Sequence, residues 1–517
     1  MKDPLVLAFD FGTQSVRASL INKKGEIEGM AKVPYVPLYY SSQSGYAEQD
    51  PDFYFENAKQ AAKILASKHT ALLSRIVAGT ITCFRDSSVQ LNNELKPIRK
   101  TILWLDQRLA RADEKIPRRY SFLFKLVGMK PTIELNRSRT VAHWLKENEP
   151  ETWEKTYKYV NISTYLTYKL TGRLIDSAAS YAGHYPICFK KRKWYKENHM
   201  KAIIFGIPSR MLCDLIQPGE TLGMLSDSFA DEVGLPRGIR MIATGSDKAC
   251  ETIGLNALSR DVAAVSYGTA CSIEVSNTKY YEPEPFLPAY PAATKNWYNM
   301  EVQVYRGYWM LTWFTKQFAS ELIDEAKLQK MAVEELLNEG LAKVKPGSEG
   351  LVLQPYWGPG LSRPLAKGAI VGFSDVHTRD HLYRAIIEGI AYALKEGLEG
   401  IEKSQLHSVK EIRVSGGGSQ SPAICQITAD IFNLPVSRVQ TYETTSLGAA
   451  ISTFHAIGEF KTIQEAMDAM SHVSKTFTPN PTAVEQYEYL YKKVYLSLFP
   501  QLKDVYRDLN KYSKRIK

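Results

Sequence analysis

Carboxylates and small polar residues follow several strand-like runs of the sequence. Asp10 comes directly after the apolar run Leu5–Phe9 and precedes the turn Gly12-Thr13-Gln14-Ser15. Glycine lets backbone N–H groups approach phosphate oxygens, and a hydroxyl side chain adds a further donor. A carboxylate at this point is suited to holding Mg²⁺ through water. The segment therefore predicts a phosphate-binding turn with Asp10 as a metal ligand, and a simple hairpin is the structural alternative.

A second turn of the same kind stands in the other half of the chain. The run Ala263-Ala264-Val265 leads into Ser266–Ala270, in which Gly268-Thr269 takes the place that Gly12-Thr13 takes earlier. A repeat that divides the chain near its middle indicates two duplicated domains that face each other. We expect both turns to bind the phosphates of ATP.

Asp247 is the candidate general base. It follows the apolar run Met241–Thr244 and a Gly-Ser turn, and it stands where a helix is expected to begin. As a structural residue it would cap that helix. As a functional residue it would lie at the carboxyl end of a strand, where open α/β sheets place their sites, and accept the proton of a hydroxyl during phosphoryl transfer. We also count Asp247, with Asp10, as a metal ligand.

A glycine-rich segment follows the predicted strand Glu411–Val414. Three consecutive glycines leave a flat platform on which a nucleotide base and ribose can lie, although a flexible strand–helix loop would have the same composition. The residues that we expect to contact ATP here are Gly416, Gly417, Gly418, Ser419 and Ser421.

The acceptor side of the site is predicted around Arg85 and Asp86. These paired charges follow the strand Ile76–Thr82 and could hydrogen-bond vicinal hydroxyls of a sugar, or form a surface salt bridge. Trp104, with Asp106 and Arg108 near it, is expected in the same pocket. Lys248 either binds an anionic or polar substrate or belongs to a structural ion pair.

Alternating strand and helix patterns position these residues and predict an α/β fold. The predicted strands include Val16–Ile21 and Ile27–Val33, and the predicted helices include Ala142–Glu147, Thr164–Leu170, Arg379–Gly400 and Pro422–Phe432. We place an N-terminal domain at residues 1–256, a C-terminal domain at 257–490 and a basic tail at 491–517, whose charges suggest a solvated face or a loose end.

The composition is that of a soluble globular protein, with 44% hydrophobic and 23% charged residues. No apolar run approaches the roughly 20 residues of a membrane helix. The six scattered cysteines fit a reduced, cytoplasmic protein without disulfides or a zinc site. The net charge of +10 lacks the aromatic-basic pattern of nucleic-acid modules, so we expect it to attract anionic ligands such as ATP.

Taken together, the motifs resemble those of the FGGY carbohydrate kinases over roughly residues 5–490. Asp10–Ala18 is similar to the family's DxGTTSxRA start, and Gly245-Ser246-Asp247 resembles the G-x-D of its catalytic base. Further similar segments are Arg85-Asp86 (an RE pair in the sugar-contacting segment), Trp144–Pro150 (WLKENEP), Leu170–Gly172 (LTG), Ser266–Thr269 (the second phosphate loop), Gly416–Asp430 (the adenosine motif) and Ser446–Ala450 (LGAA).

The resemblance implies two RNase H-like domains of the actin and hexokinase superfamily, which close over ATP, Mg²⁺ and a sugar in an interdomain cleft. The sequence also departs from the family. The xylulokinase-type QMHG segment is replaced by Thr82-Cys83-Phe84-Arg85, and Lys248 stands where many relatives carry a neutral residue. The segment Pro355–Arg363 lacks the glutamate of the PYLxGERxP motif.

The expected function is ATP-dependent phosphorylation of a small sugar or polyol, with a xylulose-like ketose favoured. A glycerol or sugar-acid kinase is the nearest alternative. A non-kinase ATPase of the actin or heat-shock chaperone type and a sugar-responsive binding protein are alternatives of other classes. We expect no nucleic-acid or membrane partner, and a homodimer is one oligomeric state that the sequence leaves open.

Overall fold

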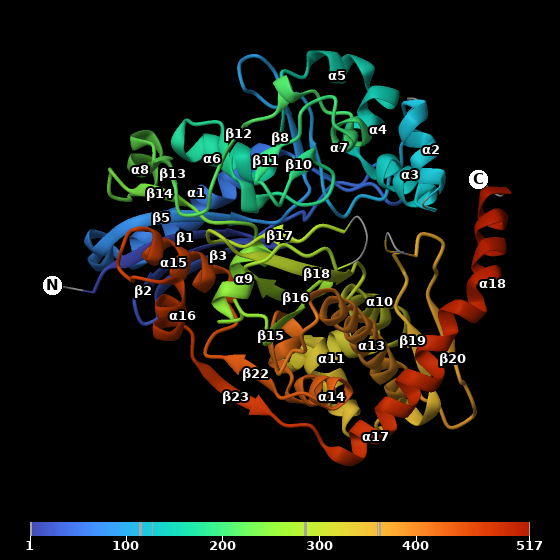
Figure 1. The fold of residues 1–517 in the computed structure, drawn as a ribbon. Coiled ribbons are helices and arrows are strands. Elements are labelled where there is room, and N and C mark those ends of the chain that lie inside the picture. The colour runs from blue at the N-terminus through green and yellow to red at the C-terminus, as the bar shows by residue number, and fades with distance from the viewer. Residues whose placement is uncertain are drawn as a thin grey trace.

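The computed structural model describes residues 3–112, 116–126, 128–283, 287–358, 360 and 363–515, with only the backbone at 119, 123 and 514. Two large α/β domains lie one above the other in Figure 1, each built on a mixed sheet. The α/β fold class predicted from the sequence is therefore confirmed.

The N-terminal domain is built on a six-stranded sheet with the order β13-β14-β5-β1-β2-β3. Strands β3, β2 and β1 form an antiparallel meander, β5 and β14 add parallel to β1, and β13 is antiparallel at the edge. Strand β1 is buried at every position because helices cover both faces of the sheet. The strands are β1 Leu5–Phe11, β2 Ser15–Asn22, β3 Ile27–Pro34, β5 Ile76–Cys83, β13 Thr221–Met224 and β14 Arg240–Ala243.

The C-terminal domain repeats this topology. Strands β18, β16 and β15 form the meander, β21 and β22 add in parallel, and β23 is antiparallel at the edge, with β17 as an additional strand beside β18. The strands are β15 Val262–Tyr267, β16 Cys271–Asn277, β17 Tyr290–Pro291, β18 Tyr298–Val304, β21 Glu411–Ser415, β22 Val436–Val439 and β23 Val473–Phe477. The duplication predicted from the two Gly-Thr turns is thus present, and both turns join the first two strands of their sheets.

Helices and a small sheet complete the N-terminal domain. The small sheet has the order β4-β7-β6-β8, with β4 Glu48–Gln49, β6 Ser88–Leu91, β7 Thr101–Ile102 and β8 Lys158–Asn161. The helices are α1 Pro51–Lys68, α2 Arg118–Leu126, α3 Lys130–Arg139, α4 Val141–Asn148, α5 Pro150–Lys155, α6 Ile162–Thr171, α7 Met200–Phe205, α8 Asp227–Val233 and α9 Asp247–Gly254. Short two-stranded ribbons join β9 Ile175–Ser177 with β12 Asp214–Ile216, and β10 Ile187–Cys188 with β11 Lys193–Trp194.

The helices of the C-terminal domain are α10 Trp309–Phe318, α11 Glu321–Gln329, α12 Val333–Leu341, α13 Arg379–Gln405, α14 Pro422–Phe432, α15 Thr444–Ala456, α16 Ile463–Met470, α17 Pro481–Tyr489 and α18 Leu496–Arg515. Several of them surround its sheet in the lower half of Figure 1, while α15 and α16 lie beside the N-terminal sheet and α18 runs along the right edge. A two-stranded ribbon joins β19 Val352–Gln354 and β20 Ala369–Val371. The predicted helices 142–147, 164–170, 379–400 and 422–432 are confirmed within a few residues.

The segment that we expected to be a basic tail is helical. A π-helical segment, Leu490–Tyr495, continues α17 into α18, and the side chains of Tyr491, Tyr495 and Tyr506 are buried. The rings of Tyr491 and Tyr495 stack on each other. Tyr491 also stacks on Tyr392 of α13, and Tyr495 packs against the same ring at a tilt. Aromatic packing therefore anchors this segment to the C-terminal domain. Its lysines 492, 493, 503 and 511 are exposed, and residues 516 and 517 lie outside the described residues.

Helices α9 and α15 follow equivalent strands of the two sheets and cross each other at two glycines. A Cβ on Gly254 would lie 1.9 Å from the Thr444 carbonyl oxygen, and a Cβ on Gly448 would lie 1.8 Å from the Cys250 carbonyl oxygen. The two backbones are therefore in direct contact. Figure 1 also shows α15 and α16 beside β1 and β2, where they share an apolar cluster with Val6, Ala8 and Ile21.

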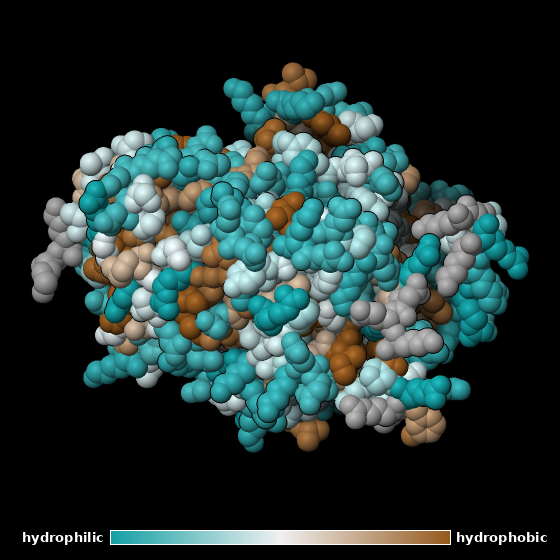
Figure 2. All heavy atoms as spheres, turned by 90° about the horizontal axis from the view of Figure 1, so that it is seen from above, coloured by the Kyte–Doolittle hydropathy of each residue, from teal (hydrophilic) through white to brown (hydrophobic). Residues whose placement is uncertain are grey.

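The face seen from above in Figure 2 is mostly hydrophilic, with scattered apolar side chains. In the parts of the chain that the structure describes, no helix combines the length and apolar character needed to cross a bilayer.

Candidate active site

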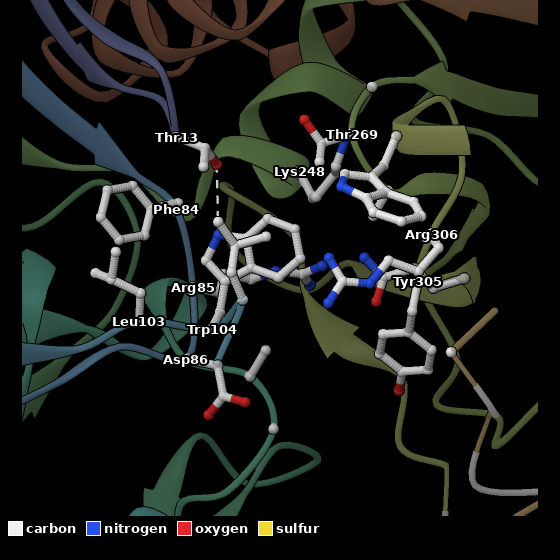
Figure 3. Close-up of a pocket in the computed structure, with 18 of the residues that line it drawn as sticks. Thr13, Phe84, Arg85, Asp86, Leu103, Trp104, Lys248, Thr269, Tyr305 and Arg306 are labelled. Carbon is white, nitrogen blue, oxygen red and sulfur yellow. Dashed lines mark hydrogen bonds between the residues drawn. The ribbon is translucent and has the colours of Figure 1, made fainter. Parts of the chain in front are cut away.

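A cleft of about 2240 Å³ lies between the two domains and brings the predicted site residues together (Figure 3). Its wall contains residues 12–15 and 268–269 of the two turns, Gly416–Gly418 and Ser421 of the glycine-rich loop, and Arg85, Asp86, Trp104, Asp247 and Lys248. Two predicted residues lie beneath the surface instead. Asp10 is 4% exposed at the end of β1, and Ser419 is 1% exposed behind its loop.

The glycine-rich loop lies against two tyrosines and contains a 3₁₀ turn at Gly417–Gln420. Gly416 adopts φ +77°, and a Cβ there would lie 2.6 Å from the Tyr267 carbonyl oxygen. A Cβ on Gly418 would lie 2.0 Å from the ring of Tyr308, which stacks on Tyr267 with centroids 5.0 Å apart. The buried Ser419 hydroxyl donates to the Gly416 carbonyl at 2.7 Å and so shapes the loop. Gly416 and Gly418 have no room for a side chain because Tyr267 and Tyr308 pack directly against the loop.

The two Gly-Thr turns approach the cleft from opposite domains. In the first, Gly12 N–H donates to the Ser15 carbonyl at 3.0 Å, and the Trp104 indole lies 3.4 Å from the Thr13 hydroxyl. In the second, the carbonyls of Gly268 and Thr269 accept from the backbone at the start of α10. Each turn is therefore held by its own domain.

Asp247 stands in the first turn of α9, and the preceding Ser246 is the residue that caps the helix. The Ser246 hydroxyl accepts from Ala249 N–H at 3.3 Å, so the capping role that we considered for Asp247 is already filled. Burial raises the pKa of the Asp247 carboxyl, while the positive charges of Lys248 and Arg85 act in the opposite direction. A partly desolvated carboxylate facing the cleft has the properties of a general base.

Asp10 lies close to several other carboxylates. Burial raises its pKa to about 7, Arg17 opposes this shift from 3.7 Å, and Glu443, Asp247 and Glu251 add to it. Arg17 also forms an ion pair with Glu443 at 2.7 Å. This surplus of buried negative charge fits a divalent cation. Among the described residues no three or more ligating side chains cluster, so a cation here would keep water or phosphate ligands, as Mg²⁺ prefers.

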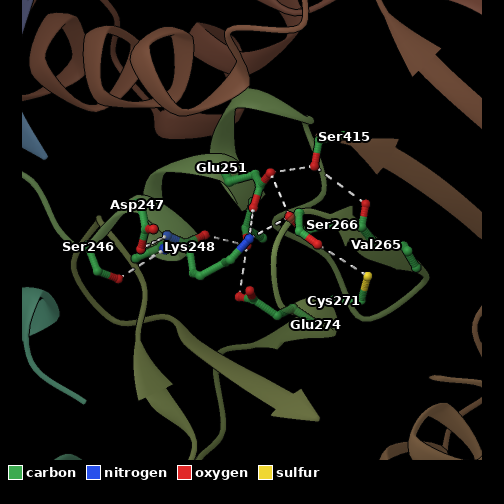
Figure 4. Close-up of polar contacts among 12 residues, drawn as sticks. Ser246, Asp247, Lys248, Glu251, Val265, Ser266, Cys271, Glu274 and Ser415 are labelled. Atoms are coloured by element: carbon green, nitrogen blue, oxygen red, sulfur yellow. Dashed lines mark hydrogen bonds and ion pairs between the residues drawn. The ribbon is translucent and has the colours of Figure 1, made fainter. Parts of the chain in front are cut away.

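Lys248 belongs to a buried polar network rather than facing the cleft freely (Figure 4). Its Nζ donates to Glu251 Oε2 at 2.7 Å and to the Ser266 hydroxyl at 2.5 Å. Glu251 Oε1 accepts from Ser266 at 3.0 Å and from Ser415 at 2.5 Å. Ser266 precedes the second Gly-Thr turn and Ser415 precedes the glycine-rich loop, so one carboxylate links both segments to the helix of Asp247.

Arg85 and Asp86 do not pair with each other or form a surface salt bridge. Arg85, with its side chain 13% exposed, makes two 2.7 Å hydrogen bonds to Glu301 of β18 in the opposite domain. Asp86 adopts φ 58° and lies 2.7 Å from His184 Nδ1. The partners Glu301 and His184 have no motif in the sequence and were not predicted.

Asp106 and Arg108 of the predicted pocket form a salt bridge, with 2.7 Å between Asp106 Oδ2 and Arg108 Nη2. Arg108 also reaches Glu48 at 2.8 Å and stacks over Tyr46. Both residues line the cleft, but their charges are neutralised within the N-terminal domain.

Comparison with known proteins agrees with this geometry. The model of the FGGY family of carbohydrate kinases, N-terminal domain, matches residues 5–254, and the model of its C-terminal domain matches residues 263–457. A xylulose kinase from Lactococcus lactis is 28% identical, with 95% of this chain and 96% of that protein covered. A glycerol kinase from Thermococcus onnurineus is 28% identical over 92% of this chain and 94% of its own.

Solved structures show the same fold. A ligand-bound xylulose kinase and a gluconate kinase, both from Lactobacillus acidophilus, each have a TM-score of 0.81 at 22% identity, covering 98% of this chain and all of theirs. Because both family models match and together span most of the sequence, the chain belongs to the FGGY family of carbohydrate kinases.

Proposed function

We propose that this carbohydrate kinase transfers the γ-phosphoryl group of ATP to a hydroxyl of a small sugar or polyol, with Asp247 as general base. The observation that carries the proposal is the position of Asp247, which lines one interdomain cleft together with both Gly-Thr turns and the glycine-rich loop. The acceptor hydroxyl gives its proton to Asp247 while its oxygen attacks the γ-phosphorus, and ADP leaves in line.

The two domains take different parts in this reaction. We assign nucleotide binding mainly to residues 257–490, through the second Gly-Thr turn and the platform Gly416–Gly418, with the first turn adding phosphate contacts. We assign acceptor binding to residues 1–256, through Arg85, Asp86 and Trp104. Asp10 and Asp247 would hold Mg²⁺, which when bound would neutralise charge on the phosphate oxygens.

Two of the predicted acceptor contacts take different roles in this proposal. Arg85 is bound to Glu301, so it would offer the acceptor only those N–H groups that this pair leaves free. Lys248 is bound to Glu251 and Ser266, so we now assign it to positioning the base rather than to direct substrate contact. The family resemblance taken alone favours a xylulose-like ketose, with glycerol and sugar acids as alternatives, and the charges of the cleft, considered below, bear on the choice among them.

The test is ADP release by the purified protein with ATP and Mg²⁺ against pentuloses, hexuloses, polyols, aldonates and glycerol. Turnover that depends on one acceptor, and that Asp247→Ala abolishes, would support the proposal. ADP release that needs no acceptor would favour an ATPase of the actin or chaperone type. If no compound of the panel supports ADP release although ATP still binds, the proposed acceptor class is contradicted.

A further inference from the structure

Arg306 is a cation of the cleft that the function described so far does not use. It lies between β18 and α10 of the C-terminal domain and lines the cleft. Figure 3 shows its side chain directed into the cleft, toward the side from which Arg85 and Trp104 project, while Thr13 and Thr269 lie above in this view. This position favours contact between Arg306 and the acceptor rather than between Arg306 and phosphates bound at the two turns.

Three other partly buried cations of the cleft are neutralised by carboxylates. Arg85 forms an ion pair with Glu301, Lys248 with Glu251, and Arg108 with Asp106, each with 2.7 Å between nitrogen and oxygen. These carboxylates help to raise the pKa of each of the three cations.

Arg306 differs from these three. Within the described ranges of the chain it makes no hydrogen bond or ion pair, and its guanidinium lies 5.1 Å from the centre of the Trp309 ring. Burial lowers its pKa, and the Tyr39 hydroxyl of the other domain opposes this shift. A partly buried charge that no described carboxylate neutralises is costly, so we explain this residue by a ligand that brings the negative charge.

A second guanidinium lies close by. Arg139 of α3 stands 5.7 Å from the ring centre of Tyr305, the residue before Arg306, and it lines the same cleft from the N-terminal domain. Guanidinium groups from both domains therefore flank Tyr305 at this end of the cleft.

Resting on the kinase function proposed above, we propose that the acceptor is a sugar acid and that Arg306 binds its carboxylate. The planar fork of a guanidinium matches the two oxygens of a carboxylate and can bind them in a bidentate manner. The nucleotide phosphates are a less suitable ligand, because the start of α10 bonds to the second Gly-Thr turn through its backbone N–H groups and leaves the Arg306 side chain directed elsewhere.

The experiment compares acids with the alcohols that differ only at the charged carbon. D-gluconate is paired with D-glucitol and D-xylonate with xylitol, at saturating ATP and Mg²⁺, for the wild type, Arg306→Gln and Arg306→Lys. Lys316→Gln, which removes an exposed positive charge from the rim of the same cleft, is the matched control. Calorimetric titration of each acid and alcohol without ATP gives a readout independent of turnover.

We expect the wild type to prefer the acid of each pair. Arg306→Gln should lower kcat/KM for the acid by roughly 10- to 100-fold, the size expected for a lost charge-assisted hydrogen bond, and leave the alcohol and the KM for ATP unchanged. Arg306→Lys should recover part of the loss, and Lys316→Gln should behave like the wild type.

Other outcomes would overturn the inference. If the wild type prefers a neutral acceptor and Arg306→Gln does not change its kinetics, the kinase function stands and the sugar-acid assignment is wrong. If Arg306→Gln raises only the KM for ATP, Arg306 belongs to the nucleotide site. If no acceptor supports turnover, the proposed function fails, and calorimetry decides separately whether an acid binds through Arg306.

Discussion

The buried carboxyl of Asp10 should make the metal-free protein less stable as the pH rises, and Asp10→Asn should remove this effect. Its pKa is about 7 in the folded protein against 3.8 for an exposed aspartate, because burial and neighbouring carboxylates oppose ionisation. The folded state therefore binds the proton more tightly than the unfolded state. The stability from this group is full below about pH 4 and is lost as the pH rises through about 7.

The size of the stability change follows from the pKa shift of Asp10. A displacement of about 3 pKa units corresponds to about 4 kcal/mol in all, at about 1.4 kcal/mol per unit. Between pH 5 and pH 8 the folded carboxyl loses its proton, and about 3 kcal/mol of this total is lost in that window. Asparagine has a similar shape and no charge, so Asp10→Asn should not lose this stability between pH 5 and pH 8.

The assay is thermal unfolding of metal-free wild type and Asp10→Asn at pH 5 and pH 8. Asp504→Asn, at an exposed position of α18, controls for the change in net charge. We expect the Tm of Asp10→Asn relative to the wild type to be clearly higher at pH 8 than at pH 5. Because the chain has two domains, Tm differences of the first transition are compared rather than one global free energy.

Added Mg²⁺ provides a second measurement. It should raise the Tm of the wild type at pH 8 and have little effect on Asp10→Asn, because binding to the folded state stabilises it. A Tm difference that is equal at both pH values, or a variant that is less stable than the wild type at pH 8, would refute the reasoning. Either result would mean that Arg17 already neutralises Asp10.

Three further predictions concern the cleft. Asp247→Ala should lower kcat by about 10²-fold or more and leave ATP binding intact, measured by ADP release and calorimetry; normal turnover would exclude Asp247 as the base. Arg85→Ala should raise the acceptor KM more than the ATP KM and, by leaving Glu301 buried without a partner, cost about 3–5 kcal/mol in unfolding. Arg85→Met with Glu301→Met should recover most of that stability, and an equal loss in the double variant would contradict the pairing. Glu251→Gln should weaken ATP binding by about 10-fold or more, since it disturbs both segments that precede the nucleotide loops, and an unchanged ATP affinity would contradict this.

Local patterns were sufficient to predict the fold class, the duplication and the segments that meet in the cleft. Glycine turns, the Gly-Ser-Asp sequence before α9 and the run Gly416–Gly418 are features of a few adjacent residues, and the sheets position them without further information. The helical end of the chain was missed, although Tyr487, Tyr491 and Tyr495 recur every fourth residue and gave the signal of a buried helix face.

The partners across the cleft could not be predicted in the same way. Glu301 lies within a strand, and its pairing with Arg85 depends on how two domains dock, which no local pattern encodes. His184 meets Asp86 through a loop, again at long range in the sequence. Arg306 has no surrounding motif, and its significance became visible only because no carboxylate among the described residues forms an ion pair with it.

The glycine crossing of α9 and α15 has a consequence for controlling the conformation of the enzyme. The proposed base, Asp247, is the first residue of α9, and each helix follows a strand of a different domain, so the crossing angle sets how the two halves of the cleft face each other. A methyl group at Gly254 or Gly448 has no room beside the opposing carbonyl and would act as a wedge between the helices. Alanine at either position should therefore give a conformational trap, a folded enzyme with altered domain separation, useful for capturing one state of the catalytic cycle for scattering or crystallography.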